Sequence, residues 1–472
     1  MSPNPLRNLP SVHELLDTPP LKTLVERISQ SSVMSTVRTV LDEVRHEVLT
    51  AASDRTLPSV SDLAERIARR VTEGQSPVLQ PVINATGILL HAGLGRAPLA
   101  DDAIAEMAAV ARGYANLEMD LASGQKSRRQ AAVESLLHEL TGAEAALVVN
   151  NNAGATLLTL AALAAGREVL VSRGQLIETD DGFRLPEIVA ASGAVLRDVG
   201  ATNGTRPDDY ARAIGPQTAA LMLVHASRFV AAGLSAGVGL EELVDVGRRH
   251  KLPVIHNLGT GALLDLSPFG IQGEPVVGDS VKGGASLVLL SGDKLLGGPP
   301  CGIILGRKSL IEKIERHPLA RTLRVGKLTL AALAGTLRPY RDPEKARLRI
   351  PLLQLLTASM DNLKNRAERL APQAAATAAV GEAEAVTDVS CLGGASPGHE
   401  LPTWCVALKP AAMTGDRLAA ALRMGSPPVL GRVKEDRLLL DLRSVLPRQD
   451  SQLIAALEAL EQPTGEATKE TP

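Results

Sequence analysis

Short apolar runs alternate with longer helix-like segments between about residues 77 and 316, and this alternation is the strongest constraint on the fold. Apolar runs of strand length occupy residues 145–149, 168–171, 219–224, 252–255 and 287–290. Runs of this length, with helical segments between them, are typical of parallel strands that are buried on both faces. The sequence therefore predicts an α/β domain whose mostly parallel sheet is covered by helices on both sides.

The regions on either side of this alternation have different patterns. Near the start, apolar residues recur at spacings of three and four, which predicts helices. After the alternation, residues 327–370 are helical in pattern and Arg437–Leu442 is the clearest later strand. We expect four regions: a helical domain over 1–75, a large α/β domain over 76–345, a small α/β domain over 346–462 and a disordered tail over 463–472.

Aromatic residues are scarce, with three Phe, three Tyr and one Trp among 472 residues. The core must therefore consist mainly of Leu, Val, Ile and Ala, and binding of nucleic acid by base stacking is disfavoured. A formal net charge of −2 gives no general attraction to nucleic acid or to membranes. Any contact with RNA must then depend on phosphates and shape.

Cysteine usage and the amino-terminal sequence indicate the compartment. The three cysteines are too few and too scattered for a disulfide framework or a zinc site, so we expect no metal. We see neither a signal-peptide pattern nor about twenty consecutive apolar residues. These observations predict a cytoplasmic protein without a membrane partner.

A single lysine stands between small residues in the segment Ser291–Gly298, directly after the apolar run 285–290. An enzyme that holds pyridoxal phosphate as a Schiff base needs such a lysine. Desolvation by an apolar strand lowers the pKa of the amine, and flanking glycines let the flat cofactor approach the backbone. The same local pattern also fits a simple surface turn.

Two other apolar runs end in polar residues. Residues 145–149 lead into Asn150–Ala155, where a helix N-terminus would present backbone N–H groups to a phosphate. Residues 252–256 lead into Asn257 and a glycine-rich turn, and ligands of open α/β sheets bind at such strand ends. The order of phosphate site, ring-nitrogen partner and lysine is similar to that of the aspartate-aminotransferase-like, fold type I pyridoxal enzymes.

Many collinear motifs of the chain together resemble one family, the bacterial selenocysteine synthases, or L-seryl-tRNA(Sec) selenium transferases. The matching segments are residues 6–12, 82–87, 94–97, 150–152, 171–174, 183–184, 224–225, 291–299, 317–324, 393–394, 428–432 and 441–443. The resemblance implies the fold type I architecture, pyridoxal 5'-phosphate as cofactor, and seryl-tRNA(Sec) and selenophosphate as substrates. It also implies a tRNA-binding domain at the start of the chain and a homo-oligomer, in the family a decamer.

The resemblance also implies roles for individual residues. Lys294 would carry the cofactor and move a proton, and Asp293 would take part in the chemistry. Residues implied to contact the cofactor are Asn151, Asn152, Ala153, His225 and Asn257. Residues implied to bind the anionic donor are Arg96, Arg129, Arg321 and Arg324, and arginine suits phosphate because its planar fork donates two parallel hydrogen bonds.

Plainer interpretations stand beside these roles. Asp293 could be an ordinary turn carboxylate, and His225 could be structural. Arg321 and Arg324, three residues apart, could share a solvent-facing side of one helix. Against this, residues 307–349 contain twelve Lys and Arg but only four Asp and Glu, which predicts a local positive field.

The chain departs from the family at several positions near the expected site. Asn257 stands where the family has an aspartate that would pair with the protonated pyridine nitrogen. Further departures are Ala92–Gly93 for Thr-Asn, Lys126–Ser127 for Arg-Gly, Asp180–Asp181 for two glycines, Gly204 for arginine, Arg228 for asparagine, Pro300 for glutamine and Gly326 for aspartate. These departures leave three hypotheses: selenium transfer, a pyridoxal-dependent lyase that acts on a small amino compound, and a weakly catalytic paralogue that keeps the fold and assembly.

Overall fold

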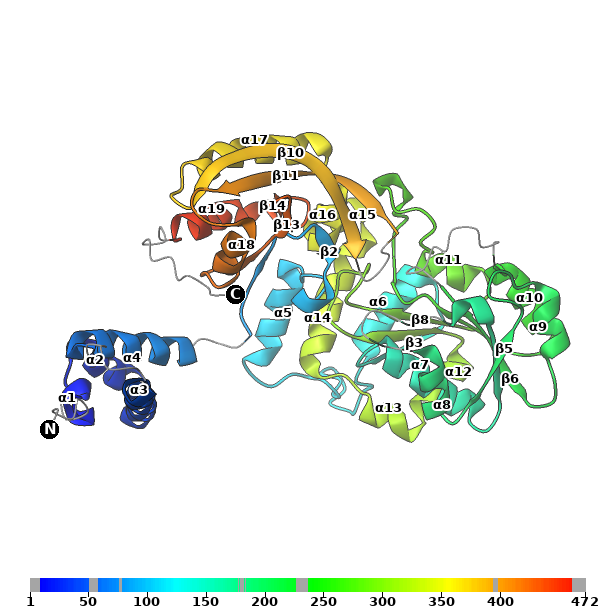
Figure 1. Ribbon diagram of the computed structural model, residues 1–472. Coiled ribbons are helices and arrows are strands. Elements are labelled where there is room, and N and C mark those ends of the chain that lie inside the picture. Colours follow the sequence, from blue (N-terminus) through cyan, green and yellow to red (C-terminus); the bar gives the residue numbers. More distant parts are fainter. Residues whose placement is uncertain are drawn as a thin grey trace. The chain divides into compact units, whose positions relative to one another are not determined.

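The computed structural model describes residues 9–50, 58–75, 79–176, 178, 182, 184–225, 237–393 and 398–460. The chain divides into two compact units, Met1–Pro81 and Val82–Pro472 (Figure 1). Within the described ranges, no helix combines the length and apolar character that crossing a bilayer requires. The tail predicted at 463–472 lies outside the described residues.

The described part of the first unit consists of helices, as the apolar spacing predicts. They are α1 (Val12–Leu16), α2 (Pro19–Arg27), α3 (Gln30–Thr50) and α4 (Val60–Gln75). Ser11 begins α1 with a capping box, because its side chain accepts from the Glu14 amide while the Glu14 side chain accepts from the Ser11 amide. Buried residues at helical spacing, such as Val33, Val37 and Val40 in α3, form the core of this unit.

The second unit contains a seven-stranded sheet with the strand order β3-β9-β8-β7-β6-β4-β5. Its strands are β3 (Ala145–Val149), β4 (Glu168–Ser172), β5 (Val195–Val199), β6 (Thr218–Val224), β7 (Val254–Asn257), β8 (Leu287–Ser291) and β9 (Gly302–Gly306). Strands β5, β4, β6, β7 and β8 form parallel pairs, and β9 is antiparallel to both β8 and β3. The predicted mostly parallel sheet is confirmed.

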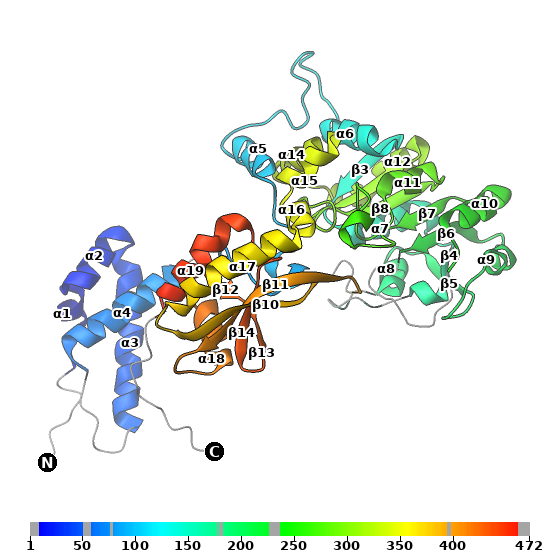
Figure 2. The ribbon, with the colours of Figure 1, turned by 90° about the horizontal axis from the view of Figure 1, so that it is seen from above.

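Helices cover both faces of this sheet (Figures 1 and 2). They are α6 (Ala131–Thr141), α7 (Asn152–Ala164), α8 (Leu185–Ala191), α9 (Pro207–Ala213), α10 (Leu240–His250), α11 (Val277–Lys282), α12 (Lys308–Glu315), α13 (Pro318–Thr322) and α14 (Lys327–Leu337), and α5 (Asp101–Ala111) packs on α14. Successive strand residues face opposite sides: Leu147 packs with α7, α8 and α12, whereas Val148 packs with α6, α11 and α14. A short apolar run therefore suffices to bury a strand such as β3 on both sides, whereas the edge strand β5 is mostly exposed.

A second, five-stranded sheet has the order β13-β14-β11-β10-β2. Its strands are β2 (Ile88–Leu90), β10 (Val380–Gly393), β11 (Glu400–Pro410), β13 (Arg432–Lys434) and β14 (Arg437–Asp441), and β1 (Ile83–Asn84) pairs separately with β12 (Val429–Leu430). The remaining helices are α15 (Pro343–Arg349), α16 (Pro351–Thr357), α17 (Met360–Ala375), α18 (Gly415–Arg423) and α19 (Asp450–Glu458). The helical pattern over 327–370 is confirmed as a series of helices, of which α15 and α16 begin at prolines.

A buried aspartate holds the turn before β2 against the other strands of this sheet. The Asp441 side chain, fully buried, accepts hydrogen bonds from Thr403 Oγ1 at 2.7 Å and from Arg432 Nη2 at 3.0 Å. Arg432 also donates to the carbonyl oxygen of Thr86 at 3.2 Å. At Gly87 (φ +78°), a Cβ would lie 2.3 Å from Asp441 Oδ2, so only glycine allows this close approach.

Candidate functional site

Polar residues follow three strands at one edge of the seven-stranded sheet. β6, β7 and β8 are adjacent and parallel, so their carboxyl ends meet at that edge. His225 follows β6, Asn257 ends β7 and Lys294 follows β8, and the His225 amide donates to the Asn257 carbonyl at 2.9 Å. The edge is where ligands bind in open α/β sheets, as the sequence predicts.

The asparagine triplet forms a rigid entry into α7. Asn151 is the N-cap, and its Oδ1 accepts from the Gly154 amide at 2.7 Å. The Asn150 amide donates to the Leu323 carbonyl at 3.0 Å. A Cβ at Gly302 would lie 2.1 Å from the Asn151 carbonyl oxygen, so β9 packs directly against this turn. The first turn of α7, which includes Ala153, thus presents its backbone N–H groups from a fixed position.

Asn257 is buried and connects β7 to α7. Its Oδ1 accepts from Asn152 Nδ2 at 2.8 Å and from the Gly259 amide at 3.2 Å. Its Nδ2 donates to Thr156 Oγ1 at 3.1 Å. Asn152 Oδ1 is buried and has no hydrogen-bond partner among the described residues. A buried acceptor of this kind normally has a donor, so this edge of the sheet suits a polar ligand.

Lys294 lies in a tight turn that small residues make possible. The Gly292 amide donates to the Cys301 carbonyl at 2.8 Å, and the Gly297 amide donates to the Lys294 carbonyl at 2.8 Å. A Cβ at Gly292 would lie 2.4 Å from Cys301 Sγ. Lys294 itself is half-buried. Burial, together with nearby Asp293, raises the pKa of Cys301 to about 12, so this thiol is not an available nucleophile.

Asp293 holds the loop that contains Arg96. Arg96 Nη1 donates to Asp293 Oδ2 at 2.7 Å, and the Ala97 amide donates to the Asp293 carbonyl at 3.3 Å. Gly95 (φ +84°) and Arg96 (φ +63°) both adopt the left-handed conformation, which turns the loop toward Asp293. Sequence reasoning treated Arg96 and Asp293 separately, whereas the structure brings them together.

Glu274 is a site residue that sequence reasoning missed. Its side chain is 1% exposed, its Oε2 accepts from Thr260 Oγ1 at 2.9 Å, and it lies 3.5 Å from His225 Nε2. Burial, with a smaller effect of His225, lowers the pKa of the neighbouring His256 to about 3, so His256 is neutral. A lone glutamate between a glycine and a proline gave no signal in the sequence.

The remaining arginines lie near the end of β3. Arg129 belongs to the long loop between α5 and α6 (Figure 2), and its Nη2 lies 2.8 Å from Glu118 Oε1. Arg129 Nη1 also donates to the Val325 carbonyl at 3.3 Å. The pKa of Glu118 is lowered mainly by Arg129, with smaller effects of Lys126 and Arg324, so these cations are close together.

Arg321 and Arg324 do not lie on one helix. Arg321 belongs to α13, which ends at Thr322, whereas Arg324 lies beyond it and forms a backbone bridge with Val149. The two arginines therefore do not share a helix, although the solvent-facing part of that interpretation remains open. Both side chains are exposed, and neither forms an ion pair with a described residue.

Several departures from the family pattern cannot be placed. Asp180, Asp181 and Arg228 lie outside the described residues. Gly204 pairs with Ala201 in a turn after β5.

Comparison with known proteins gives matches over nearly the whole chain. Residues 82–446 match the family described as L-seryl-tRNA selenium transferase, and residues 6–45 match the one described as selenocysteine synthase N terminal. The L-seryl-tRNA(Sec) selenium transferase of Moorella thermoacetica is 46% identical over 465 residues, which are 98% of each chain. That of Geobacter sulfurreducens is 43% identical over 456 residues, 96% of this chain and 98% of the relative.

Among solved structures, D-glucosaminate-6-phosphate ammonia-lyase is similar with a TM-score of 0.55 and 21% identity, over 80% of this chain and 95% of that one. At this identity the likeness shows the fold alone, and the predicted α/β architecture of the fold type I enzymes is confirmed. The family match over residues 82–446 and the identity over nearly the full length then identify the chain: it belongs to the L-seryl-tRNA selenium transferase family.

Proposed function

We propose that this chain converts seryl-tRNA(Sec) to selenocysteyl-tRNA(Sec), with selenophosphate as donor and pyridoxal 5'-phosphate as cofactor. One observation carries the proposal: Lys294, Asn257 and the N-terminus of α7 meet at one edge of the sheet in a chain that matches the family over its length. The identity of 46% and 43% to two selenium transferases, over nearly the whole chain, favours this reaction over the lyase and the weakly catalytic paralogue.

The residues present fit the cofactor. The first turn of α7 offers backbone N–H groups for a phosphate, and Lys294 offers a half-buried amine. The buried Asn152 Oδ1, which lacks a partner among the described residues, leaves hydrogen-bonding capacity beside Asn257. When bound, pyridoxal phosphate supplies an electron sink that makes the Cα proton of an attached serine acidic.

The side chains have distinct tasks in this proposal. Lys294 would hold the cofactor through Nζ, and the same amine would act as the general base that takes the proton from Cα of the serine. Asp293 fixes the Arg96 loop beside that lysine. Arg321 and Arg324 are exposed near the α7 N-terminus and bind the phosphate of the donor.

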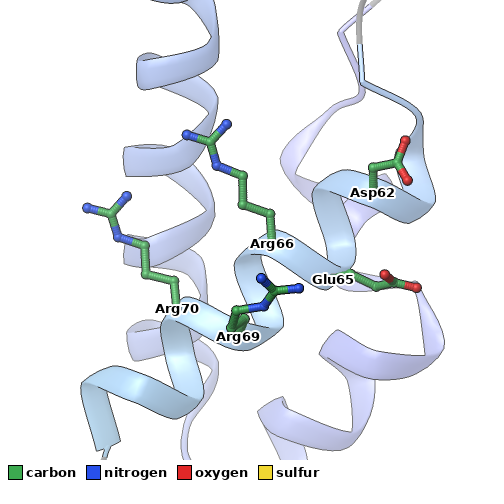
Figure 3. Close-up of a pocket in the computed structure, with 5 residues that line it drawn as sticks. All are labelled: Asp62, Glu65, Arg66, Arg69 and Arg70. Carbon is green, nitrogen blue, oxygen red and sulfur yellow. The ribbon is translucent and has the colours of Figure 1, made fainter. Parts of the chain in front are cut away.

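The helical unit at the start of the chain would dock the tRNA. Arg66, Arg69 and Arg70 project from α4 and line a pocket with Asp62 and Glu65 (Figure 3). Ion pairs to α3 hold two of these arginines: Arg66 lies 3.1 Å from Glu47, and Arg70 lies 2.6 Å from Glu43. Arg69 forms no ion pair with a described residue. Arginines whose side chains are held by ion pairs, as Arg66 and Arg70 are, can contact phosphates without recognising bases. A homo-oligomer, as in the family, is part of the proposal.

Borohydride reduction of the cofactor-loaded protein, followed by peptide mass mapping, tests the cofactor site. We expect the reduced adduct on the peptide that contains Lys294, and none in Lys294→Met. Lys282→Met, which changes an exposed lysine of α11, should retain the adduct. An adduct on another lysine, or none with excess cofactor, would contradict the proposal.

Transfer of labelled selenium from selenophosphate tests the reaction. We expect the label on seryl-tRNA(Sec) but not on seryl-tRNA(Ser), and none with Lys294→Met. Label on neither tRNA from a protein that carries the cofactor on Lys294 would favour the lyase.

A further inference from the structure

Glu274 is a buried carboxylate that the proposed reaction does not use. It lies in the loop between the 3₁₀ helix Ser267–Phe269 and α11, and its side chain is 1% exposed. Burying a carboxylate is unfavourable unless hydrogen bonds or an opposite charge compensate. Glu274 Oε2 accepts from Thr260 Oγ1 at 2.9 Å and faces His225 Nε2 at 3.5 Å.

Thr260 and His225, which Glu274 contacts, belong to the framework of the candidate site. The backbone amide of His225 donates to the backbone carbonyl of Asn257 at 2.9 Å, so His225 lies next to the buried Asn257. The Thr260 carbonyl accepts from the Leu295 amide at 3.2 Å, and Leu295 is the residue after Lys294. One carboxylate therefore joins the segment after β6, the segment after β7 and the turn after β8.

We propose that Glu274 is a positioning residue, whose carboxylate orients the His225 imidazole through Nε2 and holds Thr260 against the turn of Lys294. This inference rests on the proposed function, because it assumes that pyridoxal phosphate binds at this edge. A carboxylate that accepts from one ring nitrogen fixes the tautomer and the ring orientation, so the other nitrogen keeps a defined role toward the ligand.

A purely structural glutamate would behave differently. If Glu274 only satisfied Thr260, its replacement by glutamine would keep an oxygen for that hydroxyl, and only stability would change. A glutamate that acts through His225 would instead alter the binding and the visible absorption of the cofactor, because glutamine lacks the charge that holds the imidazole.

Titration of the cofactor-free full chain with pyridoxal phosphate, followed by absorbance, tests the inference. We expect Glu274→Gln to raise the Kd about ten-fold and to shift the absorption of the bound cofactor, and Glu274→Asp to recover most of the loss. His225→Gln should give a similar change, and the double variant Glu274→Gln/His225→Gln should be no worse than His225→Gln alone. Glu168→Gln, at the opposite end of the sheet on β4, is the matched control and should bind as wild type.

Thr260→Val tests the second contact without changing a buried charge. We expect its Kd for pyridoxal phosphate to rise several-fold, while Thr260→Ser, which keeps the hydroxyl, binds as wild type. Thr260→Val also tests the inference if Glu274→Gln does not fold. Unchanged binding of pyridoxal phosphate by Thr260→Val would then overturn the inference.

Other outcomes separate this inference from the proposed function. Glu274→Gln with wild-type affinity and absorption, or effects of Glu274→Gln and His225→Gln that add, would overturn the positioning role alone. Wild-type protein that binds no pyridoxal phosphate would overturn the proposed function and this inference with it.

Discussion

Arg96 and Asp293 form an ion pair with 2.7 Å between Nη1 and Oδ2, although they are 197 positions apart in the chain. Asp293 precedes the candidate lysine and is only 7% exposed. The positive charge of Arg96 is therefore shared with a buried carboxylate, and a substrate anion would have to compete for it. The pair also ties a loop near the start of the second unit to the turn after β8.

Loss of Arg96 should destabilise the site more than loss of the pair. Arg96→Ala leaves the buried Asp293 without this charge-assisted hydrogen bond, which costs about 1.5–3 kcal/mol. Arg96→Ala/Asp293→Ala should recover part of that free energy of unfolding. Urea denaturation of the cofactor-free protein gives both values, and an equal loss in the single and double variants would contradict the coupling.

Arg321 and Arg324 should contribute to donor binding. Replacing either by alanine removes a contact to phosphate that is worth roughly 1.5–3 kcal/mol, so the KM for selenophosphate should rise about ten-fold or more. Arg316→Ala, at the C-cap of α12, is the control because its side chain is exposed and pairs with Glu312. An unchanged KM for selenophosphate in both Arg321→Ala and Arg324→Ala would mean that these arginines face solvent and do not bind the donor.

Asn257→Asp should lower the stability of the cofactor-free protein but increase the rate of proton exchange at Cα of a bound substrate. Thr156 Oγ1 donates its proton to the Asn152 carbonyl at 2.9 Å, so it can only accept from residue 257, and a carboxylate there faces an oxygen without a free proton. This mismatch should cost about 1–3 kcal/mol of stability. If residue 257 faces the pyridine nitrogen, the restored charge pair should speed Cα proton exchange about ten-fold.

Thermal unfolding without cofactor and deuterium exchange into a bound serine analogue measure the two effects separately. Thr156→Val in the Asn257→Asp background should recover stability, because it removes the opposing oxygen. A stable apoprotein with no gain in exchange would mean that the site is adapted to a neutral pyridine.

Stability should fall as the pH drops below about 6.5, in part because of His256. Burial lowers the folded-state pKa of His256 from 6.5 to about 3, so between these values only the unfolded chain binds the proton. The stability present above pH 6.5 is lost as the pH falls toward 3, and by pH 5 the loss amounts to about 2 kcal/mol. His256→Gln should flatten the decline of Tm between pH 7 and 5, whereas His250→Gln, at an exposed position, should not.

Much of the fold was predictable from local pattern. Apolar runs marked strands that are covered on both faces, such as Ala145–Val149, whereas the edge strand β5 is mostly exposed and gave no such run. The turn of Lys294 and the N-cap at Asn151 followed from small and polar residues at strand ends. These features depend on neighbours in the sequence, which is the information that periodicity contains.

The long-range contacts of the site were not predictable in the same way. Glu274 contacts Thr260 and His225 from a loop with no periodicity, and Arg96 meets Asp293 only because two distant loops converge. Such pairs depend on the order of strands across the sheet, which local spacing does not record.

The strand pairing of residues 83–90 has a consequence for synthesis of the protein. β1 and β2 lie early in the chain, yet their partners β12 and β10 come much later, and Thr86 and Arg432 are 346 positions apart. At translation rates of about 5–20 residues per second, this early segment waits roughly 20–70 seconds for its partners. The second sheet can therefore form only after residues 380–441 have been synthesised, and a nascent chain stalled before residue 380 exposes two unpaired strands to chaperones.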